Sequence, residues 1–522
     1  MRLCTLFLAI GIAAMPAAGQ PVLSVVLENA TVVDGTGAPS FVADVGLQGD
    51  RIAAVGNLTG RRAAARIDAR GLVVAPGFID IHSHAPGSAL AARPGAENLI
   101  RQGVTTVLGG QDGSSPWPIG EALRELDSRP AAVHVGLFAG HGTIRGYVMG
   151  QASSPPSESQ LQRMKSMVAQ AMADGAFGLS SGLEYTPGMF ADLDELAALS
   201  SEMAPYGGLY ISHVRDEGGA LMESVDETIA IARRAGVPVQ LTHHKIIGKH
   251  RWGGTAASLA RVAEAREAGL DVTLDVYPYT ASSTGLTILF PAWARDGGFE
   301  ALQRRIGDPE QADRIRQDVI AHINSERGGD PATIVAARCG FDPSYDGKSL
   351  ADIATERGLE PTVEHGADIA LELVAAGSCQ GVFHSMSDDD VSRVLRSPHA
   401  MVASDGGVPE FGTGAPHPRS YGTFARVLGR YVREQGVLTL EEAVARMSGV
   451  PAARLGLTDR GRIAPGFLAD VVVFDPAAVK DHATFQDPHR YASGVRYTFV
   501  AGEAALWDGE PTGIRAGRAL RK

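Results

Sequence analysis

The chain has 522 residues, of which 44% are hydrophobic and 20% are charged, and its formal net charge is -12. This composition is that of a globular protein, and the length exceeds that of one small domain. The negative charge argues against a nucleic-acid groove or an anionic membrane surface as the partner.

Residues 1–19 have the pattern of a secretory signal peptide. Arg2 precedes an apolar run over residues 3–15, and small residues end the segment at Gly19. Cleavage before Gln20 is therefore predicted. The run is too short to span a bilayer comfortably, and no other segment is long and apolar enough. We expect a periplasmic or secreted mature chain without stable membrane insertion.

Two cysteines remain after the predicted cleavage, Cys339 and Cys379. Export makes a disulfide possible, but a single pair in a chain of this length is not a disulfide framework. We expect free thiols or at most one bridge, with no catalytic role.

Both ends of the mature chain contain short β-branched runs separated by turn signals. The N-terminal runs are residues 22–27, 30–33 and 42–47, and the C-terminal ones are residues 469–474 and 495–500. Such runs are typical of strands. We predict one small β-sandwich domain made from residues 20–76 and 462–522, with the rest of the chain inserted between them.

Between these ends, apolar runs alternate with helical stretches, the pattern of an α/β protein built from βα units. The candidate strands are residues 78–82, 105–108, 133–138, 177–181, 209–213, 237–242, 272–277, 381–384 and 401–405. We predict a TIM-like (β/α)8 barrel over residues 77–461. Nine candidates are one too many, and residues 381–384 are expected to lie outside the barrel.

The alternation of predicted strands and helices is interrupted at about residues 281–340. We interpret this segment as an insertion. Long excursions in compact domains are often lids or binding elements. An ordinary peripheral helical hairpin is the alternative.

Histidine or aspartate closes several of the predicted strands. His82 and His84 lie two residues apart and so share one face of an extended chain. His213, His243 and Asp405 end later strands. In a (β/α)8 barrel these ends gather at one face, where the active site lies. Imidazole and carboxylate groups are zinc ligands, so the set predicts a metal centre.

Several short motifs make the chain similar to a known family. They are residues 75–84, 140–145, 180–185, 212–217, 242–245, 275–279, 404–406, 417–419 and 459–470. With these motifs the mature chain resembles the metal-dependent amidohydrolase superfamily. Within it, the chain resembles the N-acyl-D-amino-acid deacylases (D-aminoacylases).

The resemblance implies one or two zinc ions. His213 and His243 would hold the catalytic ion, His82 and His84 would form a second and often weaker site, and Asp405 would be the catalytic acid/base. His243 and His244 are adjacent and should point in opposite directions, so only one is expected to be a ligand, and the alignment of the motif selects His243.

The resemblance also implies a grip on the substrate α-carboxylate by Lys245, Tyr277, Ser283 and Arg419, with Tyr279 as the alternative to Tyr277. Arg215 and Glu217 are interpreted as an ordinary salt bridge rather than as groups that orient a histidine.

One position departs from the family pattern. The family usually has a cysteine ligand in a Gly-Asn-Cys-Gly motif, and here Gly110-Gln111-Asp112-Gly113 stands in its place. Asp112 can ligate or bridge zinc through oxygen, and it is a harder ligand than thiolate. The alternative is that Asp112 is only a turn residue.

The function implied is zinc-dependent hydrolysis of N-acyl-D-amino acids by metal-activated hydroxide, with Asp405 as proton shuttle. The expected partner is a small N-acyl amino acid or short peptide, and the oligomeric state stays open. A dipeptidase or cyclic amidase of the same superfamily is one alternative. A non-catalytic periplasmic protein that binds a metal or ligand is the other.

Overall fold

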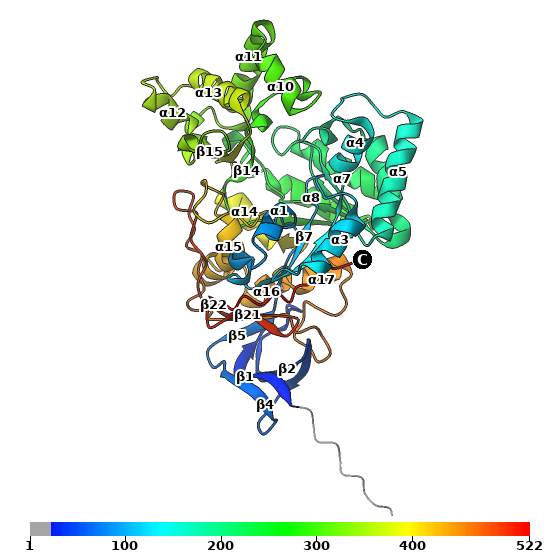
Figure 1. The fold of residues 1–522 in the computed structure, drawn as a ribbon, viewed down its shortest axis with the longest axis vertical. Coiled ribbons are helices and arrows are strands. Elements are labelled where there is room, and N and C mark those ends of the chain that lie inside the picture. Colours follow the sequence, from blue (N-terminus) through cyan, green and yellow to red (C-terminus); the bar gives the residue numbers. More distant parts are fainter. Residues whose placement is uncertain (1–21) are drawn as a thin grey trace, which may run out of the picture.

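The computed structural model describes residues 22–522, so the predicted signal peptide lies outside the described residues. Figure 1 shows three regions stacked along the long axis: a small β domain, a barrel and a helical insertion.

The β domain is one sheet of nine strands from both ends of the chain. The N-terminal strands are β1 (Leu23–Val32), β2 (Phe41–Gln48), β3 (Arg51–Gly56), β4 (Ala63–Asp68) and β5 (Val73–Pro76). The C-terminal strands are β19 (Val471–Phe474), β20 (Val495–Val500), β21 (Glu503–Trp507) and β22 (Glu510–Pro511). The two sets join where β5 pairs antiparallel with β19, with Val74 opposite Val473. Both valines are fully buried in the core of this domain.

Eight parallel strand positions form the barrel, which confirms the predicted fold class. In order they are β6 (Phe78–Asp80), β7 (Val104–Gly109), β8 with β9 (His134–Leu137 and Ala139–Gly140), β10 (Gly178–Gly182), β11 (Leu209–His213), β12 (Val239–Leu241), β13 (Val272–Val276) and β18 (Ala400–Val402). A parallel bridge between Ser83 and Gly406 closes the ring between β6 and β18. Apolar side chains such as Ile81 and Phe138 fill the interior.

Helices surround the barrel and cover its strands. They are α1 (Ser88–Ala92), α2 (Glu97–Ile100), α3 (Ile119–Ser128), α4 (His141–Met149), α5 (Glu158–Ala173), α6 (Leu193–Ser201), α7 (Leu221–Ala235), α8 (Thr255–Glu267), α14 (Asp388–Arg396), α15 (Arg419–Arg426), α16 (Leu440–Met447) and α17 (Gly449–Leu455). Among the described residues, no helix combines the length and the apolar character needed to span a membrane.

The insertion has a sheet and a hydrophobic core of its own. Its antiparallel strands are β14 (Ser282–Gly285), β15 (Ile334–Cys339), β16 (Lys348–Ser349) and β17 (Cys379–Phe383). Its helices are α9 (Ala292–Arg295), α10 (Phe299–Ile306), α11 (Pro309–Glu326), α12 (Leu350–Glu356) and α13 (Val363–Ala376), at the top of Figure 1. Cys339 and Cys379 face each other across β15 and β17 and form one disulfide.

The insertion is longer than the predicted 281–340, because its elements run to Phe383. Strand β17 pairs with β14 and β15 and packs Phe383 into the core of the insertion. Residues 381–384 therefore lie outside the barrel, as predicted.

The last residues also depart from the predicted domain division. Leu520 donates its backbone N–H to Val135 of the barrel strand β8, at 2.7 Å, and packs into the barrel interior. The C-terminal tail, predicted as part of the β domain, thus returns to the barrel.

Candidate metal centre

The predicted ligands gather at one end of the barrel. His82 and His84 follow β6, Asp112 follows β7, and His213 ends β11. His243 follows β12 and Asp405 follows β18. Because all these strands are parallel, their carboxyl ends meet at a single face of the barrel.

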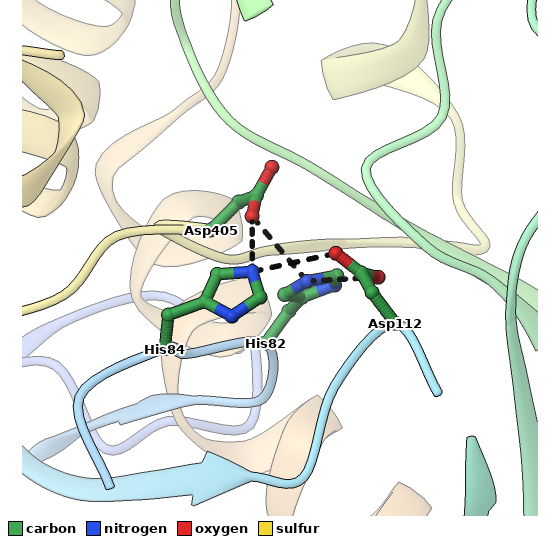
Figure 2. A group of neighbouring side chains, drawn as sticks. All are labelled: His82, His84, Asp112 and Asp405. Atoms are coloured by element: carbon green, nitrogen blue, oxygen red, sulfur yellow. Dashed lines mark hydrogen bonds and ion pairs between the residues drawn. The ribbon is translucent and has the colours of Figure 1, made fainter. Parts of the chain in front are cut away.

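The first group of ligand atoms contains His82, His84, Asp112 and Asp405 (Figure 2). His84 Nε2 lies 3.0 Å from Asp405 Oδ1 and 3.3 Å from Asp112 Oδ2. His82 Nε2 lies 3.4 Å from Asp405 Oδ1 and 3.5 Å from Asp112 Oδ1. Each of the two carboxylates therefore lies close to both imidazoles.

The second group contains Asp112, His213 and His243. Asp112 Oδ1 lies 3.9 Å from His213 Nδ1 and 3.6 Å from His243 Nε2. Asp112 thus belongs to both groups and lies between them. The neighbouring His244 lies outside both groups, since its Nε2 is 2.7 Å from Ser258 Oγ on α8.

These residues fit a metal ion on two grounds. Both ring nitrogens of His82 and the Oδ1 of Asp112 are buried without a hydrogen-bond partner, which is costly unless a ligand satisfies them. In addition, Asp112, His243 and Asp405 have positive φ angles of 51°, 34° and 49°. Residues other than glycine rarely adopt such angles, and strain of this kind is concentrated at functional sites.

Each charged group within the site stabilises the charged form of its neighbours. Burial disfavours the charged form of His84, but the hydrogen bonds that it donates to Asp112 and Asp405 outweigh this effect and raise the pKa of His84 to about 9. Conversely, burial would raise the pKa of Asp405, yet Arg419 and His82 hold it well below its usual range. A divalent cation in the same place is attracted by both carboxylates.

Two glutamates hold the outer nitrogens of the second group: Glu184, which the sequence interpretation missed, and Glu217, for which this role was the alternative to a salt bridge. Glu184 Oε2 lies 2.9 Å from His213 Nε2, and Glu217 Oε1 lies 3.1 Å from His243 Nδ1. Carboxylates in this position fix the orientation and tautomer of ligand histidines.

The predicted salt bridge between Arg215 and Glu217 is wrong. Arg215 pairs instead with Glu227 on α7 at 2.9 Å. Glu217 accepts from Lys245 Nζ at 2.5 Å, and that nitrogen also lies 2.6 Å from His243 Nδ1. In the sequence, only the motif around His213 points to Glu217. The residues that Glu217 contacts, His243 and Lys245, come after the next helix.

All four predicted substrate residues line one inner cavity of about 30 Å³, beside Asp112, His243 and Asp405. Arg419 Nη1 lies 2.7 Å from Asp405 Oδ2, and its Nη2 donates to the Ser283 carbonyl at 3.3 Å. The Tyr277 ring lies under Arg419, 4.9 Å from centroid to guanidinium carbon.

Tyr279, the alternative to Tyr277, is not among the residues that line the inner cavity. Its hydroxyl donates to the Pro418 carbonyl at 3.5 Å. The structure therefore places Tyr277, and not Tyr279, beside the candidate centre.

An outer cavity of about 1150 Å³ adjoins the inner one. The two share Asp112, Tyr185, Ser283, Thr284, Asp405 and Arg419 as lining residues. Ser283 and Thr284 come from β14, so the insertion forms part of both walls.

Two further residues of the family-like motifs, His141 and Arg145, lie away from the ligands, and so does His384. His141 and Arg145 both contact Glu195, at 2.8 and 3.2 Å, in a fully buried cluster. His384 packs edge-on against Phe485, with ring centroids 4.6 Å apart.

A (β/α)8 barrel with histidines and carboxylates at its strand ends defines a metal-dependent hydrolase. The model of the amidohydrolase family matches residues 65–505, and the chain belongs to this family.

The chain is similar over nearly its whole length to proteins named as deacylases. It is 37% identical to the N-acyl-D-glutamate deacylase of Alcaligenes xylosoxydans xylosoxydans, over 96% of this chain and 97% of the relative. It is 36% identical to the D-aminoacylase of the same organism, over 96% and 98%. The structure of N-acyl-D-glutamate deacylase from Bordetella bronchiseptica, complexed with zinc and a phosphonate inhibitor, superposes with a TM-score of 0.81. That match has 33% identity and covers 96% of this chain and 100% of the other.

Proposed function

We propose that this protein hydrolyses the amide bond of N-acyl-D-amino acids in a zinc-dependent reaction, giving a carboxylate and a free D-amino acid. The observation that carries the proposal is the pair of ligand groups sharing Asp112, directly beside a cavity lined by Lys245, Tyr277 and Arg419. The relatives named as D-aminoacylase and as deacylases of N-acyl-D-amino acids support it.

Each group has a separate task in this reaction. Bound zinc supplies a Lewis acid and lowers the pKa of water so that hydrolysis proceeds near neutral pH. Asp405 accepts the proton of the attacking water and delivers it to the leaving amine nitrogen. Glu184 keeps His213 in the tautomer that leaves Nδ1 free to bind metal. Glu217 and Lys245 both contact Nδ1 of His243 and so orient its ring with Nε2 toward Asp112.

Asp112 is proposed as a ligand common to two zinc ions. Its Oδ1 lies 3.5–3.9 Å from nitrogens of His82, His213 and His243, and its Oδ2 lies 3.3 Å from His84. Asp112 is thus the residue common to the two groups, and its carboxylate would help to hold both ions.

The test compares hydrolysis of N-acetyl-D-methionine and N-acetyl-L-methionine by zinc-loaded protein, with zinc measured by elemental analysis. Preferential hydrolysis of the D form, lost on chelation and restored by zinc, is expected. Zinc binding without hydrolysis of either form would instead favour a dipeptidase or a cyclic amidase, and dipeptides and ring amides would then be assayed. Zinc binding without turnover of any amide would favour a non-catalytic binding protein.

We also propose that the mature protein is periplasmic or secreted. The pattern of residues 1–19 supports export, and the Cys339–Cys379 disulfide suits an oxidising compartment. Mass spectrometry of the protein recovered from the periplasm or medium of a bacterial host should give an N-terminus at Gln20. Recovery of the chain from the cytoplasm alone, with residues 1–19 intact, would contradict this.

A further inference from the structure

A further cavity, of about 180 Å³, lies beside the outer one and is called the aromatic cavity here. Its walls include three aromatic rings. Phe411 and Tyr491 stack with their ring centroids 5.1 Å apart, and Tyr421 meets Tyr491 at 5.7 Å. The residues that line both the aromatic and the outer cavity mark the passage between them: Arg93, Val408 and Pro409.

The polar side chains of the aromatic cavity are already bonded within the protein. The hydroxyl of Tyr421 lies 3.0 Å from His489 Nδ1. The Nδ2 of Asn98 donates to two backbone carbonyls, at 2.9 and 2.7 Å. Glu97 accepts from Arg101 Nε at 2.8 Å. The surface left for a ligand consists mainly of the three rings and the two apolar residues of the passage, so it favours an apolar group over a polar one.

The two halves of an N-acyl amino acid occupy different parts of the site. Lys245 and Tyr277, the residues expected to bind the α-carboxylate, line the inner cavity and not the outer one. Asp112 and Asp405 line both cavities, so the amide belongs at their junction. Since the acyl group lies on the opposite side of the amide from the α-carbon, it is left in the outer cavity.

One wall of the outer cavity leads from the candidate centre to the aromatic cavity. Gly406 and Gly407 follow Asp405 directly, and neither has a side chain to block this wall. Val408 comes next, in the passage. Three residues span at most about 11 Å, so the passage lies within that distance of Asp405. An acetyl group is too short to cross it, whereas an extended alkyl chain can.

We propose that the aromatic cavity binds the end of a medium-chain acyl group, so that N-alkanoyl-D-amino acids are better substrates than their N-acetyl counterparts. The proposal rests on the N-acyl-D-amino-acid deacylase function. An apolar cavity of about 150 Å³ holds a benzene molecule, so about 180 Å³ has room for several methylene groups. Each methylene group that leaves water for an apolar wall adds to the binding.

The experiment measures kcat/KM of the zinc-loaded enzyme for N-acetyl-, N-hexanoyl- and N-decanoyl-D-methionine, at concentrations below micelle formation. The decanoyl substrate should exceed the acetyl substrate about 10- to 100-fold, since several methylene groups are buried, with the hexanoyl substrate between them. A decanoyl substrate no better than the acetyl one would overturn the proposal.

Two variants locate the binding of the acyl end. Gly95 lines the aromatic cavity, its φ lies outside the left-handed region, and a Cβ there would meet no atom within 4 Å. Gly95→Leu therefore fills space without a clash. Phe411 is 53% exposed, so Phe411→Ser removes an apolar wall and leaves the core intact. Each variant should reduce the decanoyl-to-acetyl ratio of kcat/KM at least about fivefold.

Gly340→Leu is the matched control. Gly340 also has open space at its Cβ position and an ordinary φ, and it lines neither cavity. The ratio should stay at the wild-type value in this variant. A ratio that stayed at the wild-type value in Gly95→Leu and in Phe411→Ser would overturn the proposal. An equal fall in Gly340→Leu would do the same, since the effect would then not belong to the aromatic cavity.

A binding measurement keeps this inference separate from the proposed function. Zinc-loaded Asp405→Asn protein, made slow in turnover, is titrated with N-acetyl- and N-decanoyl-D-methionine in a calorimeter. The decanoyl compound should bind at least about tenfold more tightly, and adding Gly95→Leu or Phe411→Ser should reduce that preference. If the wild type hydrolysed no N-acyl-D-amino acid, the proposed function would fail. A preference that survived both added substitutions unchanged would overturn the assignment to the aromatic cavity whatever the turnover.

Discussion

Asp405 is placed where a proton carrier for the reaction would act. It is 5% exposed, bonded to His84 and paired with Arg419, and it lies beside both cavities. We expect Asp405→Asn to lower kcat about 10²- to 10⁴-fold, the usual contribution of a positioned acid/base. Steady-state kinetics with N-acetyl-D-methionine would measure this. A kcat within a factor of three of the wild type would contradict the role, provided that the variant keeps its zinc.

Asp112 can be tested without reference to activity. Because its carboxylate is shared by both ligand groups, Asp112→Asn should reduce the zinc content from two ions per chain to one or none. Asparagine keeps the shape and tolerates the positive φ of 51°, so the fold should persist. Elemental analysis of dialysed protein gives the ratio. An unchanged ratio would show that Asp112 is only a turn residue.

The variant Asp112→Cys tests whether a thiolate can replace the carboxylate as a ligand. Thiolate is softer than carboxylate and offers one sulfur atom in place of two oxygens. We expect Asp112→Cys to retain tight zinc binding at His213 and His243 while weakening the group at His82 and His84. Equal occupancy of both groups in this variant would argue against any special role of the carboxylate.

The sequence alone predicts the position of a ligand residue when that residue directly follows a recognisable strand. His82, His84, His213 and Asp405 each follow an apolar strand, and parallel strands of a barrel carry their ends to one face. For Glu217, the sequence left two roles open, a group that orients a histidine and an ordinary salt bridge, and could not decide between them. Its partner is Lys245, and the choice between that lysine and the nearby Arg215 depends on how the loop before α7 turns back.

At the scale of elements, the disulfide joins neighbouring strands of the insertion. Cys339 and Cys379 are 40 residues apart and close a loop that contains α12 and α13. A cross-link of this span is expected to contribute about 4 kcal/mol by restricting the unfolded chain. The variant Cys339→Ser/Cys379→Ser should therefore melt at a lower temperature than the oxidised wild type.

Reduction provides the control for this prediction. Wild-type protein treated with tris(2-carboxyethyl)phosphine should melt near the temperature of the double variant, while the variant itself should not respond to the reductant. Differential scanning calorimetry measures both. A reductant effect of equal size on the variant would show that the shift has another origin.

The length of the insertion could not be predicted from the pattern of apolar strands. Residues 381–384 have the same apolar character as the barrel strands, and only their pairing distinguishes them. Val382 lies opposite Val335 in an antiparallel ladder with β15. Barrel strands are all parallel, so the direction of pairing, which no local pattern encodes, decides which sheet a strand joins.

At the scale of the whole molecule, a buried polar cluster joins the barrel to the β domain. His134 lies on β8 of the barrel, and Asp470 directly precedes β19 of the sheet. Their side chains meet at 3.0 Å, and Arg460 Nη1 lies 3.2 Å from the other oxygen of Asp470. The backbone N–H of Ala501 also donates to Asp470, at 2.8 Å. One carboxylate therefore ties three separate segments together.

This cluster makes the docking of the two domains sensitive to acid. Burial alone would raise the pKa of Asp470, but His134 and Arg460 outweigh it and lower that pKa below its usual value. A carboxyl whose folded pKa is depressed stabilises the fold fully above its unfolded pKa, about 3.9. That stabilisation is lost as the pH falls through the lower folded value.

The variant Asp470→Asn removes the charge and leaves His134 and Arg460 without their partner. We expect the free energy of unfolding at pH 7 to fall by about 3–5 kcal/mol, the cost of breaking a buried ion pair from one side. Urea denaturation of both proteins, repeated at intervals from pH 7 to pH 3, measures the difference at each pH. The difference should shrink below about pH 4, because the wild type then also loses the charge. Protonation of the zinc ligands affects both proteins alike and cancels in the comparison. A difference that stayed constant over the whole range would show that Asp470 acts through packing and not through its charge.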